Sequence, residues 1–235
     1  LQKIEKIAKE IYHADSLEIE KEKLPYEIKS FKSQDLGNET SLGITDVLNQ
    51  IVPGVFTNEV QGSPYQGDVT FRGFRASSIL GAAQGLSVYV DGIRINEPFG
   101  DVVNWDMIPE FALDNISIIP GSNPMYGLNT LGGALSLTTK SGLSHPGKVA
   151  RVSFGSFNRK KLDVSVAGKL SGGSSGDYFL SASHFDESGW RDHSDGKISN
   201  IFGKANKNTD FGSVGIMAYF GDSDLLGNGL LPSTN

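Results

Sequence analysis

The sequence predicts an α+β domain over residues 24–142, followed over residues 147–235 by about five antiparallel strands. Three observations lead to this fold class. Glycine is abundant, with 29 residues in a chain of 235, which favours a β-rich protein with many turns. The segment SLGITDVLNQI (41–51) spaces its apolar residues as a helix does. After about residue 147 the apolar residues instead alternate with polar ones, as in half-buried strands.

The first 23 residues form an N-terminal extension. Residues 1–12, LQKIEKIAKEIY, carry isoleucines at helical spacing and predict a short amphipathic helix. Residues 13–23, HADSLEIEKEK, are charged and alternate polar with apolar side chains, which favours an extended segment.

The elements of the α+β domain follow in a clear order. Ser41 is the predicted N-cap of the helix, and Pro53-Gly54 is predicted to end it. The other predicted elements are strands in LPYEIKSF (24–31), VTFRGF (69–74), LSVYVDGIRI (86–95), DNISIIPG (114–121) and ALSLTTK (134–140), with a helical turn in WDMIPEFAL (105–113).

The second region contains strands of about ten residues each. Val152, Val164, Leu180 and Ile216 are predicted to lie on apolar strand faces, with polar residues on the opposite faces. Long and short connectors fall at opposite ends of the strands after the first hairpin, as in membrane barrels. Five strands cannot close a barrel, which needs about eight. The region is therefore either one layer of a soluble sandwich or the first part of a larger barrel, and the end of the chain inside a loop-like segment favours the barrel.

The composition argues against several classes of protein. The net charge of −6 argues against nucleic-acid binding, and the absence of cysteine excludes disulfide scaffolds and thiol nucleophiles. No enzyme motif such as GxSxG, a P-loop or HExxH occurs, so no enzyme activity is predicted. The histidines and acids of HFDESGWRDHSD (184–195) lack a metal-ligand spacing, so no metal site is predicted either.

Four segments together resemble the plug domain of TonB-dependent outer-membrane receptors. They are SLGITDVLNQIVPGVF (41–56), VTFRGF (69–74), LSVYVDGIRINEPFG (86–100) and the run from Trp105 to Gly142, in the order and spacing of that family. GSFNRKKLDVSVAGKL (155–170) resembles the first barrel hairpin. SGWRDHSDGK (188–197) and GNGLLP (227–232) are similar to segments of ferric-citrate-type receptors. The resemblance implies a plug followed by the first strands of a 22-stranded barrel, of which this chain is a fragment.

The resemblance also implies a function. Such receptors lie in the outer membrane with the plug facing the periplasm, contact outer-membrane lipid, and take up a scarce ligand with energy delivered by TonB. A ferric siderophore or another iron chelate is the expected ligand, and no cofactor is expected. The alternative from the residues alone is a soluble or secreted all-β protein that binds carbohydrate or protein. That alternative requires the apolar strand faces to pack on another sheet of the same chain.

Particular residues take roles from this resemblance. The candidate TonB box, the segment that pairs with TonB as an added strand, is DSLEIE, that is Asp15, Ser16, Leu17, Glu18, Ile19 and Glu20. The family carries an Arg before Gly121 that helps to lock the plug to the barrel, but here the residue is Pro120. The lock is therefore expected to use Arg72 or hydrogen bonds.

The resemblance further indicates which loops face the ligand. They lie near 61–67, 75–85 and 96–104, and their candidate ligand contacts are Tyr65, Gln66, Arg75, Asn96 and Phe99. The glycine-rich stretch 120–142 is expected to turn tightly against the barrel wall, because glycine permits close backbone approach and positive φ. Lys140-Ser141-Gly142 is expected to link the plug to the barrel.

Overall fold

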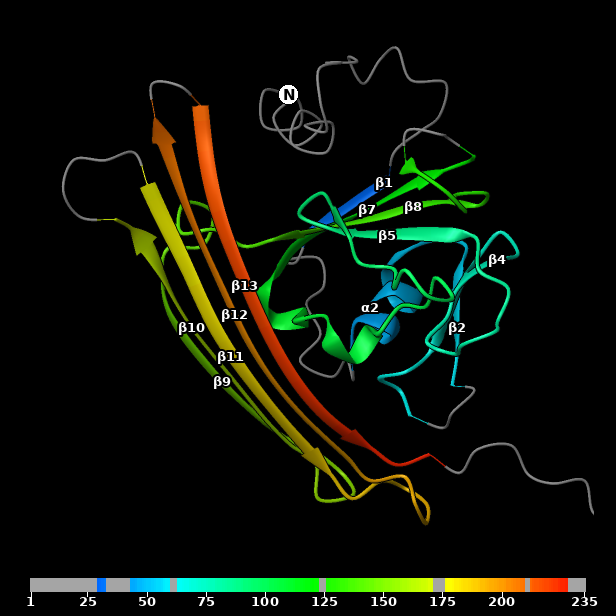
Figure 1. Cartoon of the computed structure of the whole chain (residues 1–235). Helices are drawn as coiled ribbons and strands as arrows, with labels where there is room; N and C mark the ends of the chain where they lie inside the picture. Colours follow the sequence, from blue (N-terminus) through cyan, green and yellow to red (C-terminus); the bar gives the residue numbers. More distant parts are fainter. Residues whose placement is uncertain are drawn as a thin grey trace, which may run out of the picture.

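A computed structural model describes residues 29–32, 43–59, 63–122, 126–170, 176–209 and 212–227. The chain has two parts, shown in Figure 1: an α+β domain that ends near residue 140, and a curved sheet of five strands that stands beside it. No helix in these ranges is long and apolar enough to cross a membrane.

The α+β domain is built on a mixed five-stranded sheet and a smaller three-stranded one. The large sheet has the order β1-β7-β8-β5-β6, in which β5 and β8 are parallel and the other pairs are antiparallel. The strands are β1 (Lys29–Lys32), β5 (Leu86–Val90), β6 (Ile93–Arg94), β7 (Leu113–Pro120) and β8 (Gly133–Thr139). The small sheet is the antiparallel series β2 (Val55–Asn58), β3 (Asp68–Phe71) and β4 (Phe74–Ala76).

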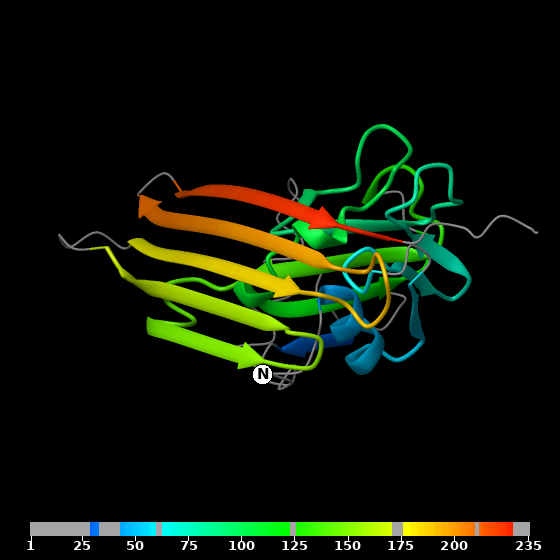
Figure 2. The ribbon, with the colours of Figure 1, turned by 90° about the horizontal axis from the view of Figure 1, so that it is seen from below.

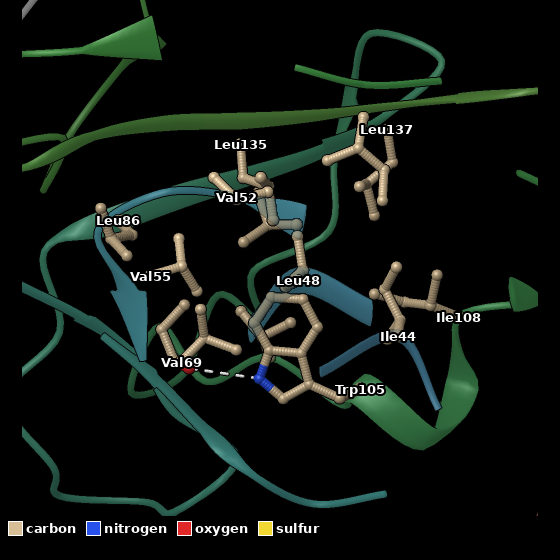
Figure 3. Packing of buried hydrophobic residues seen from close by; sticks show 14 of the residues in the cluster. Ile44, Leu48, Val52, Val55, Val69, Leu86, Trp105, Ile108, Leu135 and Leu137 are labelled. Atoms are coloured by element: carbon tan, nitrogen blue, oxygen red, sulfur yellow. Dashed lines mark hydrogen bonds between the residues drawn. The ribbon is translucent and has the colours of Figure 1, made fainter. Parts of the chain in front are cut away.

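One helix and two short 3-10 turns supply the rest of the core. Helix α2 (Ile44–Ile51) buries Ile44, Val47 and Leu48, as its periodicity predicted, and it ends before Pro53-Gly54. The turns are η2 (Trp105–Met107) and η3 (Glu110–Ala112). In Figure 3 the Trp105 indole lies among the residues of this core and donates through Nε1 to the carbonyl oxygen of Ala76, at 3.2 Å. This bond satisfies the polar atom of a fully buried side chain.

Three local predictions need correction or restriction. The residue before the helix is Gly43, which has no side chain to cap it, so the prediction of Ser41 as the N-cap is wrong. Ser41 itself lies outside the described residues. The predicted strand at 24–31 is described only from Lys29, and the predicted turn at 105–113 forms two separate 3-10 turns.

The second part is an antiparallel sheet of five sequential strands, hereafter the wall (Figure 2). Its strands are β9 (Gly147–Phe154), β10 (Lys160–Lys169), β11 (Gly176–Glu187), β12 (Gly196–Thr209) and β13 (Gly212–Leu225). Residues 155–159 and 188–195 connect strands at one end of the wall, which we call the loop end. The predicted five strands are confirmed, and each begins or ends within a few residues of its expected place.

The two faces of the wall differ in chemistry, as the alternation predicted. Register places Val164, Ala182, Ile201 and Phe220 in one row across four strands. This face points away from the α+β domain, and Ile201 and Phe220 are 58% and 65% exposed. The opposite face buries Phe179, Phe185, Ile198 and Phe202. Within the described residues no second sheet covers the outward apolar face, so the packing that a soluble sandwich requires is not found.

Candidate functional site

The inner face of the wall packs against the α+β domain through a small apolar cluster. Ala112 of η3 lies with Ala167, Phe179 and Phe202 of the wall in one buried group. The rings of Phe179 and Phe202 are 6.2 Å apart between centroids. This contact is small, and most of the other contacts between the two parts are polar.

The most connected polar contact joins Lys204 of β12 to the β5–β6 turn. Lys204 Nζ lies 3.0 Å from Asp91 Oδ2 and 3.2 Å from Thr139 Oγ1. Asp91 also accepts hydrogen bonds from the Thr139 backbone N–H and hydroxyl. Asp91-Gly92 forms a two-residue turn with both φ values positive (48° and 82°), as Asp-Gly hairpins favour. The hairpin thus aims the carboxylate at the end of β8 and at the wall.

A second ion pair and a hydroxyl contact lie nearer the loop end. Lys161 Nζ of β10 is 3.2 Å from Glu110 Oε2 of η3. The Ser223 hydroxyl of β13 donates to Asp106 Oδ2 of η2 at 2.6 Å. In both ion pairs the wall supplies the lysine and the α+β domain supplies the carboxylate.

The link between the two parts approaches the wall very closely at Gly142. Its N–H donates to Asp177 Oδ2 at 2.8 Å, and Asp177 is only 4% exposed. A Cβ on Gly142 would lie 2.3 Å from the Gly168 carbonyl oxygen and 2.5 Å from that of Tyr178. Only glycine fits this approach, so the linker is held against the wall at a fixed point.

Titratable groups flank this link. Lys140 Nζ donates to the Phe111 carbonyl oxygen at 2.6 Å and lies over the Phe111 ring. Burial, with a smaller contribution from Arg151, lowers the pKa of Lys140. His145 Nε2 lies 3.7 Å from Asp114 Oδ1. Burial lowers the pKa of His145, and Asp114 partly opposes this effect.

Two other glycines of the stretch 120–142 make close contacts inside the α+β domain. A Cβ on Gly132 would lie 2.4 Å from the Phe74 side chain, and one on Gly133 would lie 2.3 Å from the Ile119 carbonyl oxygen. Gly133 has a φ of 140°. Within the described residues, the expected close approach to the wall is therefore made by Gly142, whereas Gly132 and Gly133 fit β8 against its own domain.

The predicted lock residue Arg72 lies in the β3–β4 turn. Arg72 and Gly73 both have positive φ values, 51° and 87°, and the Arg72 side chain lies over the Phe71 ring at 5.1 Å. It makes no ion pair with the five described wall strands, so its role as a lock stays a prediction. The sequence did not predict Lys161 and Lys204 as contacts between the α+β domain and the wall. Both lie on the strand face opposite the outward apolar face, where a lysine indicates a polar interface.

Two of the candidate ligand residues are held inside the structure. The Tyr65 ring lies 4.7 Å from that of Phe185 of the wall, between centroids. Asn96 is 8% exposed, and its Oδ1 accepts from the Val88 N–H at 2.7 Å while its amide donates to Leu86 O. Both residues position loops, Tyr65 against the wall and Asn96 against β5.

The other three candidates are more accessible to solvent. Gln66 is half-buried, the Arg75 side chain is 52% exposed, and Phe99 is 78% exposed. Phe99 belongs to a loop braced by the Arg94–Asp101 ion pair, at 2.7 Å. The candidate TonB box, Asp15 to Glu20, lies outside the described residues.

Comparison with known families identifies the α+β domain. Residues 20–134 match the family model of the TonB-dependent receptor plug domain, a range that includes the helix, the 3-10 turns and every strand of both sheets except most of β8. The chain carries the plug domain of a TonB-dependent receptor. The strands that follow the plug are then the first strands of the receptor barrel, and the contacts described above lie between plug and barrel wall.

Known proteins of this family resemble the chain in sequence and in structure. The ferric aerobactin receptor of Klebsiella pneumoniae is 30% identical over 134 residues, which are 55% of this chain and 16% of that receptor. The pyoverdine receptor FpvA of Pseudomonas aeruginosa, bound to pyoverdine, matches with a TM-score of 0.66 at 17% identity, over 87% of this chain and 28% of FpvA. The unliganded ferric citrate transporter FecA matches with a TM-score of 0.62 at 21% identity, over 85% and 32% of the two chains.

These matches fix the architecture of the receptor fragment. The matched part of the chain spans 16% of the length of the aerobactin receptor. The two structural matches show a shared fold that includes both plug and wall. The exposed apolar face of the wall is accordingly the outer face of a barrel.

Proposed function

We propose that the full-length protein is an outer-membrane receptor that takes up an iron chelate with energy supplied by TonB. The plug domain carries this proposal, because a plugged barrel blocks diffusion and its transport must be driven. The names of three similar proteins specify iron chelates, namely ferric aerobactin, pyoverdine and ferric citrate, and thereby favour this class of cargo. A cargo other than an iron chelate is the competing outcome.

We place the loop end of the wall outside the cell and the N-terminal side of the plug in the periplasm. Membrane barrels carry their longer connections on the outer side. Two plug loops reach toward the loop end, since Tyr65 contacts Phe185 and Asp106 contacts Ser223, both close to that end of their strands. The ligand would then meet the half-buried Gln66 and the exposed side chains of Arg75 and Phe99. Tyr65 and Asn96 would shape the same surface from below by holding the two loops.

The plug–wall contacts suggest how the plug is held and released. TonB would pair with residues 15–20 as an added strand and pull on the plug. Lys204–Asp91 and Lys161–Glu110 are polar contacts that water can replace when the plug moves, at less cost than exposing an apolar core. Gly142 and Asp177 would hold the linker to the wall while other parts of the plug shift.

Uptake of radioactive iron by cells tests the proposal. A strain that lacks the full-length gene should lose uptake of one ferric chelate from a panel with citrate, aerobactin and pyoverdine, and grow poorly without free iron. The wild-type gene should restore uptake. Leu17→Pro should bind the chelate but not import it, because proline removes a backbone donor and disfavours strand pairing. Leu17→Ala, which keeps the N–H, is the matched control.

Three results would count against parts of this proposal. If the deletion strain takes up every chelate normally but loses uptake of cobalamin or another solute, the cargo is that solute and not an iron chelate. Full import by Leu17→Pro would move the TonB box elsewhere. The control for Phe99→Ala is Leu128→Ala, at an exposed leucine elsewhere in the plug. If Phe99→Ala leaves the affinity for the chelate unchanged, as this control should, Phe99 is not part of the ligand surface.

A further inference from the structure

A cavity of about 40 Å³ lies between the plug and the wall. Its plug side includes Tyr65, Asp106 and Glu110, and its wall side includes Asp163 and Asn200. The lining is thus rich in polar groups from both parts of the receptor. Tyr65 and Phe185, whose rings are in contact, both line the cavity, so it lies at the plug–wall interface.

Two buried polar atoms at this cavity have no hydrogen-bond partner within the described residues. They are the Tyr65 hydroxyl and Asp163 Oδ1. Asp163 is 1% exposed, so bulk solvent does not satisfy its carboxylate. A buried carboxylate oxygen or hydroxyl without a partner is costly, and native proteins rarely retain one.

The two atoms are chemically complementary. Burial, followed by the nearby charge of Glu110, raises the pKa of Tyr65 well above its ordinary value, so the phenol stays protonated and can donate. When the Asp163 carboxylate is ionised, its Oδ1 acts as a hydrogen-bond acceptor and not as a donor. Lys161 is already paired with Glu110 at 3.2 Å. Arg159 pairs with Glu187 through two contacts of 3.0 Å, and neither cation donates to Asp163 Oδ1.

We propose that ordered water fills this cavity and joins the Tyr65 hydroxyl of the plug to the Asp163 carboxylate of the wall. A water molecule needs about 10–15 Å³ of such space and two to four polar partners, so the cavity suits about three waters. A metal ion fits the lining less well, because the described residues contain no group of three or more His, Cys, Asp or Glu that could hold one.

The inference adds a mechanical property to the proposed function and rests on it. A bridge made of water can break when the plug moves and leave both atoms hydrated, since more water enters the widening gap. A direct ion pair such as Lys204–Asp91 must instead lose a specific partner. On this flank of the plug the water bridge would break at little cost, whereas Glu110 and Asp106 keep direct contacts with Lys161 and Ser223 of the wall.

The sign of one mutational effect tests the water bridge. In purified full-length receptor without chelate or TonB, Tyr65→Phe should lower the melting temperature of the plug, because it removes a hydroxyl that water satisfies. A dry cavity predicts the reverse, since the change would delete an unpaired buried group. Tyr89→Phe removes a direct hydrogen bond to the Tyr126 carbonyl oxygen. Its drop in melting temperature is the reference for the loss of one ordinary hydrogen bond.

A double-mutant cycle and a high-resolution structure complete the test. Asp163→Asn combined with Tyr65→Phe should lower the melting temperature by less than the sum of the single changes, because both act on one bridge. A crystal structure should show water within hydrogen-bond distance of both atoms. A raised or unchanged melting temperature in Tyr65→Phe, strict additivity, or density for a metal ion would overturn the inference. None of these measurements depends on iron uptake, so failure of the bridge and failure of the proposed function are distinguishable.

Discussion

Lys204→Met should loosen the plug at the β5–β6 turn while leaving the wall folded. Methionine keeps most of the length of the lysine stem but loses the ammonium group that bonds Asp91 and Thr139. The Lys204 and Asp91 side chains are 18% and 14% exposed, so water replaces the lost partner only in part. The change leaves a largely buried carboxylate with fewer donors.

The expected magnitude follows from what Asp91 retains. Removing one partner of a fully buried ion pair costs about 3–5 kcal/mol. A hydrogen bond to a charged group contributes about 1.5–3 kcal/mol. Asp91 keeps the N–H and hydroxyl of Thr139, so the cost should lie in the lower range, near 2 kcal/mol. This corresponds to a population of the opened turn that is about 30-fold larger.

Hydrogen exchange measured by mass spectrometry on the full-length receptor detects this opening. Peptides that contain residues 86–95 and 133–139 should exchange about 30-fold faster in Lys204→Met, by the same conversion. Lys207→Met changes an exposed lysine three residues further along β12 and should leave both peptides unchanged. Asp91→Asn should reduce the effect of Lys204→Met when the two are combined. Less than threefold acceleration, or equal effects of the two lysine changes, would refute the ion pair as a holding contact.

Three other predictions follow from the wall and the linker. Gly142→Ala should destabilise the plug–wall junction, seen as faster proteolysis at 140–146, whereas Gly168→Ala, whose added Cβ would lie 3.5 Å from its nearest neighbour, should not. Ile201→Lys should lower folding stability in lipid vesicles by about 2–4 kcal/mol, and Ser199→Lys, nearer the loop end on the same face, should cost less; equal losses would contradict a lipid-facing band. The pKa of His145 is lowered from 6.5 in the folded state, so the unfolded chain binds the proton more tightly. The free energy of unfolding should therefore fall as the pH drops below about 6.5. A pH titration of plug unfolding should show that His145→Gln removes this pH dependence.

Local patterns in the sequence predicted the fold well. Alternation assigned Val164 and Leu180 to the outward face of the wall, because register in an antiparallel sheet keeps residues of one parity together. The spacing of Ile44, Val47 and Leu48 predicted the buried face of α2. The predicted strands at 69–74 and 86–95 are each divided by a turn with positive φ, at Arg72-Gly73 and at Asp91-Gly92. Each of these features depends on residues within a few positions of one another.

The contacts between plug and wall could not be predicted in this way. Lys204 and Asp91 are 113 positions apart, and nothing in either local segment specifies the other. Tyr65 lies in a loop rich in glycine and proline that looked accessible, yet packing against Phe185 buries its hydroxyl. Pairing between residues so far apart in the sequence depends on how the two parts dock. Alternation shows only that Lys161 and Lys204 lie on the polar face of the wall.

Pro120 stands where the family carries a lock arginine, and the ion pairs found between plug and wall involve other plug residues. A plug arginine would need a carboxylate on the wall, and the two ion pairs between the plug and the described wall strands have the opposite sense. Lys161 and Lys204 come from the wall, and Glu110 and Asp91 from the plug. Pro120 pairs with Gly133 at one end of the β7–β8 ladder, whereas Lys204 contacts Thr139 at the other end, so neither lysine contact takes the place of an arginine at position 120. Within the described residues the plug is held to the wall by these two lysine contacts, by the Asp106–Ser223 bond, by the Ala112 cluster and by the linker at Gly142. The water bridge proposed for the Tyr65–Asp163 cavity would add a contact next to the Lys161–Glu110 pair.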